Sequence, residues 1–510
     1  MQYLREISQI ITNTPRQRED IFVDRAAGRP SDHVARLYEG IRSGKYLSDQ
    51  SAVQDIYGTA QKHGTYAVLK SRLRTRLLNS LFVLDPKPPR YSEGTRAFYQ
   101  CHKGLFWASV LLRFGARNIA IQIAERTLEE ATTYQFTSIV LELLFFLRGH
   151  YSLLGNYAEF EAINTRLNQT LQMLEAEFLS REYLERVTIK FATTEAEQPE
   201  IASLARTYSD ALDPLRKIFD NFSINLNYYR LRALSLQIAQ EYAPAIEVCE
   251  EAAQYLRGNP RLVLGVNLGE FALQKLSCLL HLRDYERGKV TAQECATHFP
   301  TGSNNWFTYM EYFFLLSMHT EHFEEAHRIY IAATTHARFA GLTETRKEKW
   351  KIFELYLQYV VQSLNPDTST KPIGRATRTF DRKRILRMVP TYSRDKYGYN
   401  IALLVMHILY LLDQHDLEGI INRMEALKAY RSRYLTMRSN RLSALFFKLL
   451  LVMEANSFDY KRTKQKGEKY YQQLLITTPG SEEFNETLQV LPFDWLWLHV
   501  LEKLKRLNPN

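Results

Sequence analysis

The sequence predicts an all-α protein in which short antiparallel helix pairs stack on one another. Small and aromatic residues recur along one helix face at Phe323, Ala326, Tyr330 and Ala333, a spacing that suits a second helix packing back on a first. Similar segments occur elsewhere in the chain. In addition, 45% of the residues are hydrophobic and 24% are charged, values typical of globular proteins that bury a large core.

Four other segments repeat this design, each combining a first apolar helix, a turn and a second helix. One helix pair cannot bury its own apolar face, so the recurrence predicts neighbours stacked on both sides. In the second of these segments Cys249 takes the later aromatic position. The segments are residues 147–160, with a turn at Gly155-Asn156, residues 229–252, residues 276–300 and, more weakly, residues 410–427.

The spacing at Phe323 resembles the second helix of a tetratricopeptide repeat, in which aromatic and alanine residues alternate at these intervals. Pro300 stands where that family commonly places its terminal proline. The resemblance implies a tetratricopeptide-like α-solenoid of stacked helix pairs, with helical caps at both ends. It also implies a concave surface suited to an extended peptide or to a helix of another protein.

Two proline-containing segments, residues 85–90 and 365–372, divide the predicted fold because proline cannot continue a helix. We expect an N-terminal helical cap over residues 1–90 and the repeat solenoid over residues 91–365. Residues 366–510 are predicted to form a basic C-terminal helical region with further repeat-like pairs. Its last helix contains Trp495 and Trp497 and either caps the stack or docks on a partner, and we favour the cap.

Charge is distributed unevenly along the chain. Residues 371–510 contain 24 basic and 14 acidic side chains, and this excess equals the net charge of +10 of the whole sequence. Residues 1–90 contain 15 basic and 9 acidic side chains, and residues 91–370 contain 27 and 33. The chain therefore has basic ends and an acidic middle.

A dense basic cluster follows the second proline-containing segment, with Phe380 and Tyr392 interleaved. Cations beside aromatic rings are typical of single-stranded nucleic-acid binding. The same pattern also fits a solvated helix face, or a contact with an acidic protein, and we give these interpretations more weight. A second basic stretch, residues 461–469, is interpreted as a solvated face. The candidate contacts in the first cluster are Arg378, Arg382, Lys383, Arg384 and Arg387.

No residue pattern indicates catalysis, a metal or a cofactor. The segment from Gly40 to Tyr46 has three residues between its glycines, whereas a phosphate-binding loop requires four and a hydroxyl after the lysine. His319 and His322 fall at a turn between helices, where we expect solvated side chains and no metal site. Cys101 is followed directly by a histidine, but adjacent residues on a helix point about 100° apart. We therefore expect a protein that is not an enzyme.

The sequence also predicts a cytoplasmic protein without a membrane segment. Its longest apolar run, residues 401–412, is interrupted by His407 and is shorter than the roughly 20 residues needed to span a bilayer. The N-terminus carries charges in its first turns, so we expect no signal peptide. The cysteines lack metal-ligand spacing and suit buried, reduced thiols.

Three further segments, residues 394–400, 430–435 and 491–501, resemble a family of uncharacterised helical-repeat proteins from bacteroidete bacteria. The resemblance implies a bacterial protein and covers most of the chain. It implies no activity and transfers no site residues.

The functional prediction is a non-catalytic scaffold that binds a peptide or protein partner on a concave helical surface. Side chains on the first helices of the pairs are expected to line that surface. The alternative is a nucleic-acid-binding regulatory or defence-associated protein that uses the basic C-terminal region. The candidate partner-binding residues are Arg148, Tyr151, Tyr229, Arg230 and Tyr312.

Overall fold

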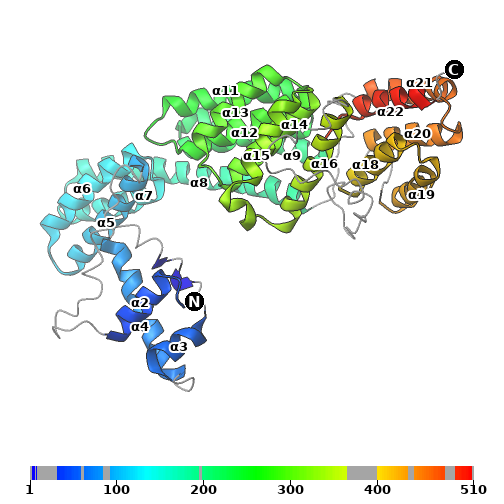
Figure 1. Cartoon of the computed structure of the whole chain (residues 1–510). Coiled ribbons are helices and arrows are strands. Elements are labelled where there is room, and N and C mark those ends of the chain that lie inside the picture. The colour runs from blue at the N-terminus through cyan, green and yellow to red at the C-terminus, as the bar shows by residue number, and fades with distance from the viewer. Residues whose placement is uncertain are drawn as a thin grey trace. The chain divides into compact units, whose positions relative to one another are not determined.

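The structure is a computed structural model, and it describes residues 3–5, 7–8, 32–46, 48–58, 63–83, 92–193, 198–364, 399–434, 441–476 and 489–507. Within these ranges every regular element is helical and no strand is present. Figure 1 shows that successive helices lie side by side in adjacent pairs. The predicted all-α, solenoid-like fold class is confirmed.

By contacts, the chain divides into two compact units, Met1–Leu174 (unit 1) and Glu175–Asn510 (unit 2). The division falls within α8 (Tyr157–Thr193), which supplies residues to both units. The boundaries predicted from proline, near residues 90 and 365, lie outside the described residues and stay predictions. The other helices of unit 1 are α2 (Asp32–Arg42), α3 (Asp49–Tyr57), α4 (His63–Val83), α5 (Glu93–Arg113), α6 (Arg117–Thr133) and α7 (Thr137–Leu153).

Unit 2 continues the same construction. Its first part contains α9 (Gln198–Phe219), α10 (Phe222–Ile238), α11 (Tyr242–Gly258), α12 (Gly265–Leu282), α13 (Tyr285–His298), α14 (Asn304–His319), α15 (Phe323–Thr334) and α16 (Glu344–Leu364). A short 3-10 helix, η2 (Ala337–Gly341), precedes α16. Its second part contains α18 (Tyr399–Asp413), α19 (Leu417–Tyr434), α20 (Arg441–Ala455), α21 (Tyr460–Ile476) and α22 (Phe493–Leu507).

The pair α14–α15 shows why the sequence pattern produces stacked helices. Ala326 and Ala333 are completely buried, while Phe323 and Tyr330 are half-buried against the same core. Alanine leaves room for a neighbouring helix, and the flanking rings cover the apolar surface. The same principle brings α5 against α6, where a Cβ atom on Gly104 would meet the Oγ1 atom of Thr127 at 2.1 Å.

Most of the helix pairs share one type of turn. After the first helix a single residue has a positive φ angle, and the next amide donates to a carbonyl five residues back, as in the Schellman motif. Within the described part of the chain, glycine occupies this position at Gly115 and Gly155. Elsewhere a residue with a side chain adopts the left-handed conformation, at Gln135, Gln240, Arg283, Glu321 and His415.

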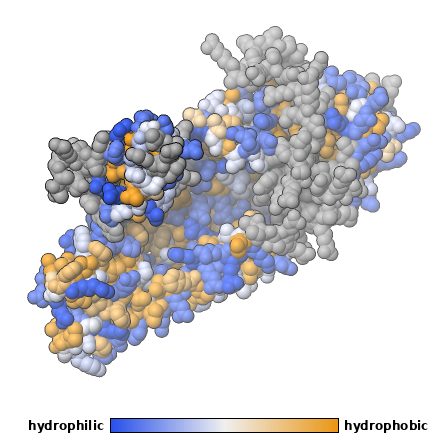
Figure 2. Space-filling model, turned by 90° about the horizontal axis from the view of Figure 1, so that it is seen from below, coloured by the Kyte–Doolittle hydropathy of each residue, from blue (hydrophilic) through white to orange (hydrophobic). Residues whose placement is uncertain are grey.

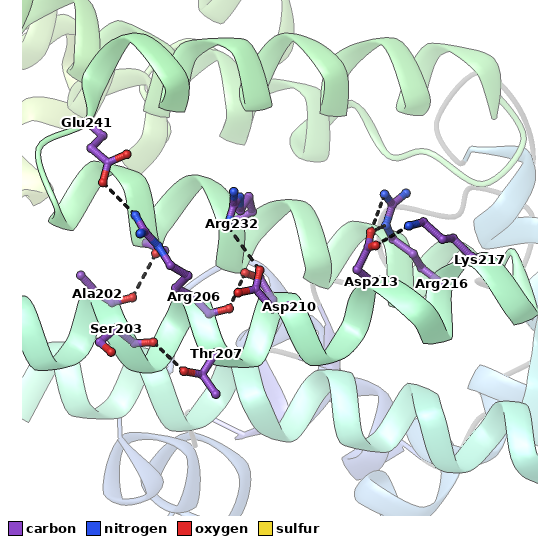
Figure 3. Close-up of polar contacts among 12 residues, drawn as sticks. Ala202, Ser203, Arg206, Thr207, Asp210, Asp213, Arg216, Lys217, Arg232 and Glu241 are labelled. Atoms are coloured by element: carbon purple, nitrogen blue, oxygen red, sulfur yellow. Dashed lines mark hydrogen bonds and ion pairs between the residues drawn. The ribbon is translucent and has the colours of Figure 1, made fainter.

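Polar contacts join α9 to α10 along their length (Figure 3). Arg206 donates to Glu241 at 2.8 Å, and Arg232 lies 3.4 Å from Asp210. The Ser235 hydroxyl donates to the Ala202 carbonyl at 3.0 Å. Because each exposed cation faces a carboxylate, this part of unit 2 leaves little charge unbalanced on its surface.

Helix α22 packs against α18, α20 and α21, with Trp497 only 1% exposed. Its first turn also contacts the distant α12–α13 turn, because Arg283 donates twice to Asp494 at 2.9 Å. The C-terminal helix thus ties the second part of unit 2 to the first. No helix among the described residues is long and apolar enough to cross a membrane.

Candidate functional site

Unit 1 contains a pocket of about 660 Å³ among helices α5, α6, α7 and α8. This volume lies in the range of natural ligand pockets. Most of its lining is aliphatic or aromatic: Leu105 and Leu112 of α5, Ile121 of α6, Leu141, Phe145 and Leu153 of α7, and Leu167 and Leu171 of α8. We call this feature the α5–α8 pocket.

Few polar groups line the α5–α8 pocket. Arg117 stands at the first position of α6, and Glu142 and His150 project from α7. The Nδ1 atom of His150 is buried, and the described residues give it no hydrogen-bond partner. A site with this lining favours apolar contact, with a small number of polar groups to orient an occupant.

Large apolar side chains at the pocket are open to solvent. Phe145 is 64% exposed and Leu153 is 70% exposed. At the end of the pocket marked by Leu112 and Leu153, Phe114 directly follows α5 and Tyr157 begins α8, and both are more than 70% exposed. Figure 2 shows hydrophobic side chains gathered over these helices, at the lower left of the view. Contiguous exposed apolar surface of this kind typically marks an interaction site.

The sequence of α7 explains how the pocket arises. Between Thr137 and Leu153 apolar residues occur on every side of the helix. The core takes up Ile139, Val140, Leu143, Leu144 and Leu147, so apolar residues on the other side of α7, Phe145 and Leu153 among them, are left exposed. A helix that is apolar all round normally has partners on all sides. Apolar residues on every side of α7 are therefore the feature of the sequence that indicates the pocket. The repeat motif does not include this feature.

Arg148 and Tyr151 lie on α7 beside the α5–α8 pocket, but neither lines it. The Nη1 atom of Arg148 donates to Asn164 at 2.9 Å, and its guanidinium lies over the Phe145 ring. The Tyr151 hydroxyl donates to Glu125 at 3.0 Å. Both side chains therefore hold the helices that frame the pocket.

The other three candidate partner-binding residues belong to unit 2. Arg230 of α10 donates to both carboxylate oxygens of Glu270, at 2.6 and 3.0 Å. Tyr229 packs beside the Tyr255 ring, and Tyr312 of α14 packs against the main core of unit 2. The structure does not bring these three residues together with Arg148 and Tyr151 within one unit. Their role in binding stays a prediction.

The basic cluster comprising Arg378, Arg382, Lys383, Arg384 and Arg387 lies outside the described residues. The second basic stretch lies on α21, where Lys461, Arg462, Lys464, Lys466 and Lys469 are all exposed. Their exposure to solvent fits the interpretation of this stretch as a solvated helix face, which stays a prediction.

The cysteine side chains, which could act as nucleophiles or metal ligands, lie in the packed interior. All four cysteines are buried, and burial raises the pKa of the Cys101, Cys278 and Cys295 thiols to about 12. Among the described residues no cluster of histidine, cysteine and carboxylate side chains could hold a metal ion.

The expectation that His319 is a solvated turn residue is wrong. Its Nε2 atom lies 2.7 Å from the backbone oxygen of Gln489, and burial lowers its pKa to about 4. The segment before α22 covers this turn, a long-range contact that local spacing did not reveal. His322 does remain exposed, and its ring stacks on Tyr285.

In comparisons with known proteins, the chain matches no family model, no curated protein and no solved structure.

Proposed function

We propose that this chain is a non-catalytic interaction scaffold whose α5–α8 pocket binds an apolar segment of another protein. The observation that carries the proposal is the exposure of Phe145 and Leu153 at the rim of a concave, largely aliphatic pocket. Protein interfaces concentrate their binding energy in large apolar anchors that fill such pockets.

The shape of the site favours a short peptide segment, helical or extended, over a flat protein surface. A helix of a partner presents apolar residues at intervals of three and four and can lay them into a groove between helices. Arg117 and Glu142 then stand at the edge of the contact, where charges set orientation more than affinity.

Selection of binders from a displayed random-peptide library on the full-length chain tests the proposal, because such a library does not require the natural partner. We expect enriched peptides with several large apolar residues, and we expect the double variant Phe145→Asp and Leu153→Asp to lose their binding. Aspartate places a charge where the bound side chain would be desolvated.

The control variant carries aspartate at two apolar positions of unit 2 with matching exposure, Val290 at 65% and Ile218 at 70%. It should bind the selected peptides like the natural chain. Peptides that bind both variants equally well, or a failure to enrich apolar peptides at all, would contradict the proposal. Circular dichroism spectra of both variants confirm that the helical fold is kept.

A further inference from the structure

Helix α21 presents one side to the protein and the other to solvent. Thr463 and Gly467 are buried, and a Cβ atom on Gly467 would come within 2.9 Å of the Trp497 ring of α22. The helix therefore lies close against α22, and it also packs against α20. The small residues on its inner side fix which side chains face outward.

Three outward-facing cations form a ridge on α21. Arg462, Lys466 and Lys469 follow one another at intervals of four and three residues, so they share one helix face over about 10 Å. All three are exposed, and among the described residues no carboxylate pairs with any of them. The one acidic residue between positions 461 and 473 is Glu468, which lies on the opposite flank and accepts from Gln472 at 2.7 Å.

A fourth cation stands beside the ridge. The Nζ atom of Lys448 on α20 lies 5.6 Å from the centre of the Tyr470 ring, and Tyr470 is one helical turn beyond Lys466. Like charges one turn apart destabilise a helix by about 0.2–0.5 kcal/mol per pair. On α9 and α10, by contrast, Arg206 and Arg232 face carboxylates.

We propose that this ridge on α21 binds the phosphate backbone of a nucleic acid. Between residues 461 and 473 its exposed face consists of lysine, arginine, glutamine and one glutamate, and the exposed apolar side chains of α21, Leu475 and Ile476, stand only at the end of the helix. Protein interfaces concentrate apolar anchors at their centre, and a helix that lies in a membrane surface buries an apolar face in it. Nucleic-acid interfaces are instead polar and positively charged, and glutamine donates to phosphate and sugar oxygens.

The inference concerns a surface of unit 2 and goes beyond the peptide-binding function proposed for unit 1. The aromatic residues of the stretch are not exposed, since Tyr460, Tyr470 and Tyr471 pack against the core. Binding at the ridge is therefore ionic, without base stacking, and should depend little on base sequence.

Fluorescence anisotropy with a labelled duplex DNA of mixed sequence tests the proposal. The background is the full-length chain with Arg378, Arg382, Lys383, Arg384 and Arg387 changed to serine, so that any binding they contribute is removed. Four phosphate contacts predict a slope of log K against log salt of about −3.6, which is about a 150-fold loss of affinity between roughly 50 and 200 mM salt.

The variant Arg462→Ser with Lys466→Ser should make this slope shallower by about 1.8. The matched control, Lys461→Ser with Lys464→Ser, removes the same charge from the other flank of α21 and should leave the slope nearly unchanged. Equal effects of the two variants, or no DNA binding by the background chain at low salt, would overturn the proposal. Polyglutamate that bound as tightly as DNA would also overturn it, because phosphate recognition would then not be needed.

Discussion

Replacement of Glu311 by alanine should destabilise unit 2 by about 3 kcal/mol. Glu311 lies on α14 and is only 4% exposed. Its carboxylate accepts from the Nε atom of Arg346 at 2.7 Å and from the Nζ atom of Lys349 at 2.9 Å, both on α16. Hydrogen bonds to charged groups contribute about 1.5–3 kcal/mol each, and removing one member of a buried ion pair costs about 3–5 kcal/mol. The lower end applies because both cations retain some contact with water.

Urea unfolding measures this effect, with tryptophan fluorescence as the probe because Trp306 and Trp350 lie in the same core. Glu311→Gln keeps an acceptor for one cation and should lose about half as much free energy of unfolding. Glu182→Ala removes an exposed ion pair with Arg186 and should cost less than about 1 kcal/mol. If Glu311→Ala cost no more than this control, the buried ion pairs would not hold α14 against α16.

Other variants test the turns, the packing and the buried histidines. Glu321→Gly should raise the free energy of unfolding of unit 2 by up to about 1 kcal/mol, and Gly155→Ala should lower that of unit 1, because only glycine adopts a positive φ angle freely. Thermal unfolding measures both changes, and a loss of stability in Glu321→Gly with a gain in Gly155→Ala would refute the assignment of these turns. Gly104→Ala should lower the free energy of unfolding of unit 1 by about 1–3 kcal/mol, because the added methyl group overpacks the contact between α5 and α6. Thermal unfolding measures this change, and an unchanged stability would mean that the two helices separate easily. Burial lowers the pKa of His281 and His499 to about 4. Between about pH 6.5 and 4 the unfolded chain therefore binds protons that the folded chain does not, and the free energy of unfolding should fall as the pH drops through this range. Changing both to glutamine should reduce this dependence in urea titrations and leave the share of His319, whose pKa is also lowered to about 4. An unchanged dependence would show that other groups cause it.

The helix pairs were predictable because alanine and aromatic residues at fixed spacing have a direct packing role. Ala326 and Ala333 are completely buried in the α14–α15 contact, as the pattern requires. The turns were harder to predict, since Gln135, Gln240 and Glu321 adopt a backbone conformation for which glycine is the usual sequence signal. Their conformation is imposed by the packing of the helices on either side.

The candidate site followed less directly from the sequence. The repeat motif pointed to Arg148 and Tyr151 on α7, whereas the pocket is lined by the apolar residues around them. Exposure of an apolar side chain depends on which neighbours the fold supplies, and a single sequence does not reveal that. Long-range contacts such as Arg283 with Asp494, separated by 211 residues, carry no local signal either.

The affinity of a selected apolar peptide for the Phe145→Ala variant tests the central claim most directly. The exposed part of this aromatic side chain is about 130 Å², which gives about 3 kcal/mol if the peptide covers it completely. The account therefore predicts an increase in Kd that approaches about 150-fold, with no change for Val290→Ala in unit 2. A Kd for Phe145→Ala within twofold of the natural chain would contradict the assignment of the α5–α8 pocket as the binding site.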